Sequence, residues 1–194
     1  FIDEKVQENS NTVKGPGCGL YLTFPTKAHE QVQMQVGLSY TNIENARNNR
    51  DSEATGKSFD DVKNAARQTW NEMLGRIQVE GGTPEDKTKF YTGLYHALLG
   101  RGIANDINGQ YIRHDKTVGQ IPLDKNGIPL YSHHNTDGMW GGFWNLTQIW
   151  TLAYPEIFSS YIKSNLDFFK NSNWLHDGEA AGVYTNGVQT NFQG

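Results

Sequence analysis

The spacing of the apolar residues changes near residue 57, and this change constrains the fold more than any other feature of the sequence. Between Val32 and Tyr40 apolar and polar residues alternate almost without a break, which is typical of a β-strand with one buried face. Residues 20–24 are a shorter candidate strand, and the residues between the two runs suit the loop of an antiparallel pair. Because two strands alone are marginally stable in water, we expect the pair to complete a sheet supplied by earlier sequence.

Beyond a polar segment at residues 42–57, apolar residues recur at intervals of three or four, which predicts amphipathic helices. Ser58 and Asp61 resemble a capping box at the start of the first helix, and a glycine pair at 81–82 interrupts it. Pro84, followed by acidic residues, predicts the start of a second helix. Each helix has an apolar stripe that another element must cover: Phe59, Val62, Ala66, Trp70, Met73 and Ile77 in the first, and Phe90, Leu94, Ala97 and Leu98 in the second.

A long loop rich in turn residues follows, from residue 103 to residue 137. Asn108-Gly109 and Asn126-Gly127 within it predict one or two short hairpins. Helical spacing returns between residues 145 and 169, with a break at Pro155, so a second pair of helices is expected there. Helix pairs joined by long loops are typical of an α/α toroid, and a small helical bundle fits the same pattern equally well.

The composition excludes several classes of protein. With 17 Lys and Arg against 21 Asp and Glu, the chain has a net charge of -4 and no basic run, so we expect no nucleic-acid partner. No stretch approaches the roughly 20 apolar residues of a membrane helix. The single cysteine, Cys18, cannot form an internal disulfide. Only 36% of the residues are apolar and the chain begins at Phe1 without a signal peptide, so we expect a segment of a longer polypeptide.

Aromatic residues make up 12% of the chain, and two tryptophans stand near the start of the third predicted helix. Trp140 and Trp144 flank a glycine pair, and Asn145 follows directly. Tryptophan faces can stack on a sugar ring while an amide supplies a donor and an acceptor, so these residues are candidate sugar ligands. Alternatively, Trp144 and Trp150 are aromatic residues of the core.

Two histidines and a carboxylate lie close together before this helix. His133, His134 and Asp137 could hold a metal ion or act as an acid/base pair. Two adjacent side chains rarely converge on one ion and no third ligand is suitably spaced, so loop polarity is the favoured interpretation. For Asp137 a contact with a sugar hydroxyl is more plausible than metal binding.

Near the end of the chain Trp174 is followed by two carboxylates, Asp177 and Glu179. Paired carboxylates are the general requirement for glycoside hydrolysis, and an exposed tryptophan adds a sugar platform. The alternative is a solvated loop anchored by Trp174, because carboxylates close in sequence need not face each other across a sugar.

Several motifs, taken together, resemble glycoside hydrolase family 92 in order and spacing, over residues 36–174. They are VGLSY at 36–40, NIENAR at 42–47, FYTGLYHALL at 90–99 and DINGQY at 106–111. The resemblance implies a β-sandwich followed by an (α/α)6 toroid. Accordingly, residues 1–57 are expected to be the last sandwich strands and linker, 58–82 a linker helix, and 83–194 the first part of the toroidal catalytic domain.

The same resemblance implies an exo-acting, inverting α-mannosidase that uses calcium. The family's glutamate acid, aspartate base and calcium ligands are expected C-terminal to residue 194, so none is assigned here. A Trp-Asp pair that contacts the sugar in the family maps onto Trp144 and Asn145. Asparagine in place of aspartate is a departure that puts the family's sugar preference in doubt, and Asp137 could compensate from the preceding loop.

The resemblance makes an α-mannoside glycan the expected substrate, the remainder of the same enzyme the expected partner, and the cell exterior or periplasm the expected location. Substrate contacts are assigned to Trp144, Asn145, Asp137, Trp140 and Trp174. Two alternatives stay open: a sugar-binding relative without catalysis, which the change at Asn145 allows, and another α/α-toroid enzyme such as a polysaccharide lyase.

Overall fold

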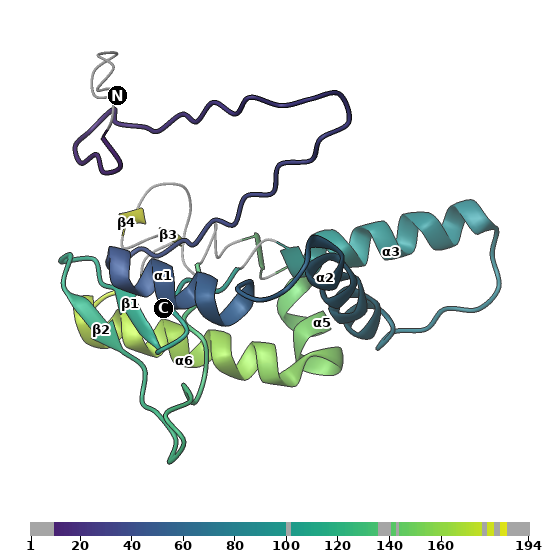
Figure 1. The fold of residues 1–194 in the computed structure, drawn as a ribbon. Helices are drawn as coiled ribbons and strands as arrows, with labels where there is room; N and C mark the ends of the chain where they lie inside the picture. Colours follow the sequence, from purple (N-terminus) through teal and green to yellow (C-terminus); the bar gives the residue numbers. More distant parts are fainter. Residues whose placement is uncertain are drawn as a thin grey trace. The chain divides into compact units, whose positions relative to one another are not determined.

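In the computed structural model of this chain the described residues are 10–99, 102–135, 141–142, 144–175, 178–180 and 183–185. The chain divides into two compact units, residues 1–34 and 35–194, and each is treated by itself. The elements labelled in Figure 1 are, in chain order, α1 (Ile43–Glu53), α2 (Phe59–Leu74), α3 (Pro84–Leu99), β1 (Gln110–Ile112), β2 (Val118–Gln120), α5 (Leu146–Ala153), α6 (Pro155–Ser172), β3 (Gly178–Ala180) and β4 (Val183–Thr185).

The antiparallel pair expected from residues 20–24 and 32–40 is not formed. Neither run is part of a strand in the described chain. Their apolar side chains stay exposed, with 66% of Leu22, 73% of Met34 and 76% of Leu38 accessible to solvent. A strand needs a hydrogen-bonded neighbour and its apolar face needs a cover, and the described residues provide neither. The β-sandwich therefore stays a prediction.

Helix α1 occupies part of the polar segment 42–57, where the sequence analysis predicted no helix. Its N-cap is Asn42, whose side chain accepts a hydrogen bond from the backbone N–H of Asn45 at 2.8 Å. Glu44 lies in the first turn and Arg50 in the last, which suits the helix dipole. The helix has no apolar stripe, and its buried residue is the polar Asn45, which explains why apolar spacing did not reveal it.

Helices α2 and α3 begin where the sequence predicts. At α2 the Ser58 side chain accepts from the N–H of Asp61, and the Asp61 carboxylate accepts from the N–H of Ser58 at 2.9 Å. Thr83 and Asp86 form the same reciprocal pair at the start of α3. Helix α2 ends at Leu74, earlier than the glycine pair at 81–82 had suggested.

Turn-rich residues 103–135 contain the antiparallel pair β1–β2, in which Gln110 pairs with Gln120 and Ile112 with Val118. Asn108-Gly109 forms a tight turn before β1 and does not join the two strands, which corrects the expected placement of one hairpin. Asn126-Gly127 closes a minimal hairpin held by a bridge from Leu123 to Pro129. Further along, β3 and β4 pair antiparallel in a region where no element was predicted.

One core joins α3, α5 and α6. It consists of Leu94, Leu146, Trp150, Tyr154 and Tyr161, with Met73, Leu74 and Ile77 partly buried against it. The Trp150 and Tyr161 rings meet edge to face at 5.4 Å, and the Tyr154 hydroxyl donates to the carbonyl oxygen of Met73 at 2.9 Å. The expected second helix pair is thus present, while closure into a toroid stays a prediction. None of the described helices has the length and apolar character that crossing a membrane requires.

Candidate functional site

Trp144 and Asn145 lie side by side at the start of α5. Trp144 is 70% exposed, whereas Leu146 and Trp150, which follow on the helix, are buried in the core. The core interpretation is therefore confirmed for Trp150, whereas Trp144 is not part of the core formed by the described residues. Asn145 occupies the N-cap position, yet its side chain makes no capping hydrogen bond and is exposed. An aromatic face and an amide thus lie next to each other at the surface, a combination that can bind a sugar.

The segment that leads toward these residues, 131–135, is attached along α6. The backbone N–H of Ser132 donates to Ser160 Oγ at 2.8 Å, and that of His134 donates to Ser164 Oγ at 3.0 Å. Tyr131 adds a hydroxyl donor to Asp167 Oδ2 at 2.6 Å. Hydrogen bonds therefore hold the segment as far as Asn135, the last described residue before Asp137 and Trp140 in the sequence.

His133 and His134 are parts of the packed interior, not polar residues of a solvated loop. Only 1% of His133 and 5% of His134 is exposed. The His133 ring stacks on Tyr111 with centroids 3.9 Å apart and meets the edge of Phe168 at 4.7 Å. Burial, with a smaller effect of His134, lowers the pKa of His133 from 6.5 to about 3. His133 is therefore uncharged at neutral pH.

Acid should destabilise the full-length protein through His133. Because the folded-state pKa, about 3, lies below the unfolded value of 6.5, the unfolded state binds more protons, and stability falls as the pH drops from 6.5 toward 3. His133→Phe should lessen that fall by up to about 1.4 kcal/mol per pH unit in urea unfolding at several pH values. The same substitution at the exposed His29 is the control. Equal slopes for His133→Phe and the wild type would contradict the prediction.

Of the other candidate residues, only Trp174 has both its backbone and its side chain described. Asp137, Trp140 and Asp177 lie outside the described residues, and for Glu179 the structure describes only the backbone, so the expected carboxylate pair is untested. Trp174 follows the end of α6 and is 58% exposed. Its backbone hydrogen bonds go to Ser172 Oγ, and the described contacts do not bring it together with Trp144.

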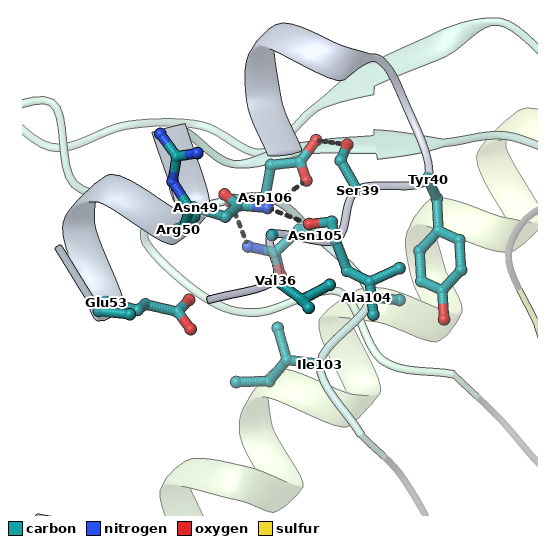
Figure 2. A pocket seen from close by; sticks show the side chains of 13 residues that line it. Val36, Ser39, Tyr40, Asn49, Arg50, Glu53, Ile103, Ala104, Asn105 and Asp106 are labelled. Atoms are coloured by element: carbon teal, nitrogen blue, oxygen red, sulfur yellow. Dashed lines mark hydrogen bonds between the residues drawn. The ribbon is translucent and has the colours of Figure 1, made fainter. Parts of the chain in front are cut away.

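A polar cluster that the sequence interpretation missed surrounds Asp106, which is only 4% exposed. Its carboxylate accepts hydrogen bonds from four side chains that precede it by more than fifty residues: Ser39, Thr41, Asn45 and Asn49. Figure 2 shows Ser39 and Asn49 directed toward Asp106. A signal was present in the sequence, because these residues fall within or next to the VGLSY, NIENAR and DINGQY motifs.

A cavity of about 460 Å³ lies beside this cluster, between residues 36–40, α1 and residues 103–106. Val36 and Ile103 give it an apolar side, and Arg50 and Glu53 bring charge from α1 (Figure 2). Val36 and Ile103 are 67% and 62% exposed. An apolar surface this accessible suits packing against further protein better than binding of a polar ligand.

Calcium is bound by clusters of oxygen ligands, mainly carboxylates and carbonyls. Within the described ranges no group of three or more His, Cys, Asp or Glu residues could hold a metal ion. The carboxylate of Asp106 is already saturated by neutral donors, and both histidines of the 131–135 segment are buried against α6. These residues therefore do not fit a calcium site.

Comparison with known proteins identifies the family. Residues 45–192 match the glycosyl hydrolase family 92 catalytic domain. Since the match covers most of the chain, the chain belongs to glycosyl hydrolase family 92, as the motifs suggested. A relative among curated proteins is named an uncharacterized secreted glycosidase, from Arthroderma benhamiae. It is 30% identical over 88 residues, which cover 42% of this chain and 11% of that protein.

Two solved structures from Bacteroides thetaiotaomicron are similar to this chain. The family GH92 α-mannosidase BT3965 matches with a TM-score of 0.69 and 23% identity, over 77% of this chain and 19% of its own. The family GH92 inverting mannosidase BT2199 matches with a TM-score of 0.65 and 26% identity, over 78% of this chain and 20% of its own. The chain thus spans about a fifth of the length of these proteins.

Proposed function

We propose that this chain is part of a longer enzyme, an exo-acting α-mannosidase that removes terminal α-mannose from glycans with inversion of configuration. Membership of glycosyl hydrolase family 92 supports a hydrolase. The names of the two similar structures, an α-mannosidase and an inverting mannosidase, support the substrate and the stereochemistry. The remainder of the same enzyme is the proposed partner of the exposed apolar residues near Val36 and Leu38.

The proposed sugar site rests on the exposure of Trp144 beside Asn145, an N-cap residue whose side chain makes no capping hydrogen bond. An asparagine at an N-cap ordinarily accepts a backbone N–H, and losing that hydrogen bond costs a helix about 1 kcal/mol. Asn145 makes no such bond although it holds the position. Its amide can therefore bind a sugar hydroxyl as donor and as acceptor, while Trp144 stacks on the apolar face of the ring.

Asn145 replaces the aspartate expected from the family's Trp-Asp pair. A carboxylate only accepts hydrogen bonds at neutral pH, whereas an amide both donates and accepts. A neutral ligand also holds a hydroxyl less strongly than a charged one. We propose that Asp137, which follows the anchored 131–135 segment in the sequence, supplies the missing charge, and that Trp140 and Trp174 widen the aromatic surface.

The catalytic carboxylates belong to the proposed remainder of the enzyme. In an inverting hydrolase one carboxylic acid protonates the leaving oxygen and a carboxylate activates water on the opposite face, with the two groups about 6.5–9.5 Å apart. The proposed calcium ion is likewise assigned ligands outside the described residues, which do not fit it. A secreted or periplasmic location is proposed from the relative named a secreted glycosidase.

The first-formed sugar should be β-mannose when the full-length protein hydrolyses an α-mannoside. Attack by water from the face opposite the leaving group inverts the anomeric carbon, and mutarotation only later mixes the anomers. Proton NMR within the first minutes of reaction measures this directly. Initial release of α-mannose would contradict inversion, and the absence of any mannose would contradict the mannosidase proposal.

The two alternatives predict different behaviour of the full-length protein with its sugar substrate. A sugar-binding relative without catalysis would bind mannosides, seen by calorimetry, and release no sugar. A polysaccharide lyase would release unsaturated sugars that absorb in the ultraviolet, and the family 92 match favours hydrolysis over this outcome.

A further inference from the structure

Two turns in the chain have the same sequence pattern and the same backbone hydrogen bonds. Residues 106–109 and 124–127 both read Asp-x-Asn-Gly. In the first, the N–H of Gly109 donates to the carbonyl oxygen of Asp106 at 2.8 Å; in the second, the N–H of Gly127 donates to that of Asp124 at 3.0 Å. Each turn is closed by the aspartate N–H, which donates at 2.8 Å to the carbonyl oxygen of the residue after the glycine.

The two aspartate carboxylates are used differently. That of Asp124 accepts from the N–H groups of Asn126 and Ile128 in its own turn, at 2.8 and 2.9 Å. That of Asp106 makes no hydrogen bond to its own turn among the described contacts, and Asn108 Oδ1 accepts the N–H of Gln110 at 3.0 Å instead. Since the turn forms without it, the Asp106 carboxylate has another role.

All four donors to Asp106 come from the segment that leads into α1 and from α1 itself. Ser39, Thr41 and Asn45 donate to Oδ2 at 2.9, 2.5 and 2.9 Å, and Asn49 donates to Oδ1 at 2.8 Å. No Lys, Arg or His of the described chain forms an ion pair with Asp106. A buried carboxylate without a cation depends on such donors, so their geometry is strongly fixed.

The backbone next to Asp106 is joined to the segment 131–135. The N–H of Ala104 donates to the carbonyl oxygen of His133 at 2.7 Å, and the N–H of His133 donates to Asn105 Oδ1 at 2.7 Å. A further hydrogen bond runs from the N–H of Asn135 to the carbonyl oxygen of Gly102 at 3.0 Å. Residues 102–106 therefore lie between α1 and the segment 133–135.

We propose that Asp106 is a positioning residue for the proposed mannosidase reaction. By holding residues 102–106 against α1, its carboxylate fixes the segment 133–135, which Asp137 and Trp140 follow in the sequence. This inference rests on the proposed function for its kinetic effect, whereas its structural effect can be measured without any substrate.

The test uses Asp106→Asn in the full-length protein. The amide of the variant keeps one acceptor oxygen but replaces the other with an NH₂ group. That NH₂ group faces the side-chain NH₂ of Asn45 or of Asn49, and two donors that face each other cannot form a hydrogen bond. The KM for an α-mannoside should rise about tenfold with a smaller change in kcat, because the catalytic carboxylates are not displaced. Amide hydrogen exchange in residues 131–145 should become faster.

Three further variants separate positioning from general damage to the fold. Asp124→Asn, in the matching turn, should leave both KM and the exchange of residues 131–145 unchanged. The double variant Asp106→Asn with Asn45→Asp restores a carboxylate facing an amide. It should bring both KM and the hydrogen exchange of residues 131–145 most of the way back to the wild-type values. Asn49→Ala, which removes one donor and keeps the carboxylate, is the milder variant and should show a smaller shift of the same kind if Asp106→Asn does not fold.

The inference is overturned if Asp106→Asn and Asn49→Ala both behave like Asp124→Asn in hydrogen exchange and in KM. It is also overturned if Asp106→Asn folds and the double variant recovers neither quantity, because the pairing of carboxylate and amide would then not be the cause. A wild-type protein that releases no mannose would contradict the proposed function alone. The exchange measurements would still decide the role of Asp106 in that event.

Discussion

Replacing Trp144 with alanine in the full-length protein should lower kcat/KM for an α-mannoside by about 30-fold, equivalent to about 2 kcal/mol. The side chain is 70% exposed, so its removal takes little packing energy from the fold. What is lost is the flat apolar face on which the proposed sugar ring stacks. Initial-rate kinetics, together with the melting temperature of the variant, measure the effect.

Trp70→Ala is the matched control. The Trp70 ring lies on α2 and contacts the Tyr95 ring of α3 with centroids 4.5 Å apart, so it packs helix against helix. This variant should lower the melting temperature more than Trp144→Ala does and leave kcat/KM of the folded enzyme within about twofold of the wild type. Equal kinetic losses in the two variants would contradict the assignment of Trp144 to the sugar site.

Chelation of calcium should abolish mannoside hydrolysis by the full-length protein, and added calcium should restore it. Calcium accepts six to eight oxygen ligands in flexible geometry, which is why it suits a site that binds sugar hydroxyls. The measurement is activity after treatment with a chelator, followed by titration with calcium. Activity that persists in excess chelator would contradict the proposed requirement.

The location of that calcium site can be tested with the same titration. Because the described acidic and histidine residues form no group able to hold a metal, substitutions among them should not change the calcium concentration for half-maximal activity. Asp124→Asn is a suitable variant, since its carboxylate only bonds its own turn. A shift in the calcium titration of this variant would place a ligand within this chain.

Helices with an apolar stripe and a local start signal could be predicted from the sequence. Ser58 and Asp61 lie three residues apart, so the capping box can be read directly, and Pro84 gives the start of α3 equally well. Trp150 and Leu146 were placed on one helix by their spacing, and both are buried in the core. These features depend on neighbours within one or two turns of helix.

Features that depend on distant or polar partners could not be predicted. Helix α1 has no apolar stripe, and the buried state of its Asn45 depends on Asp106, sixty-one residues away. The alternation between Val32 and Tyr40 indicates a strand but not its hydrogen-bonded neighbour. His133 and His134 were interpreted as loop residues because nothing local shows that α6 and Tyr111 cover them.

At the proposed sugar site, the sequence predicted that Trp144 and Asn145 start a helix and could face a ligand. It could not predict that Trp144 points outward while Trp150 points inward, because both fit the apolar spacing. Nor could it predict the unused capping position of Asn145, since asparagine is among the residues that usually cap. The anchoring of residues 131–135 was missed because its donors are backbone groups, which every sequence has.

The contacts of residues 132–135 with α6 form because one turn of helix and two residues of extended chain have nearly the same length. Four residues of helix rise about 6 Å, and two residues of extended chain rise about 6.6 Å, so the hydroxyls of Ser160 and Ser164 meet the N–H groups of Ser132 and His134 in step. The alternate N–H groups, of His133 and Asn135, face the opposite edge and bond residues 102–105. A one-residue insertion here would exchange the two edges, whereas a two-residue insertion would preserve them. An insertion within residues 132–135 that keeps both sets of hydrogen bonds must therefore contain an even number of residues.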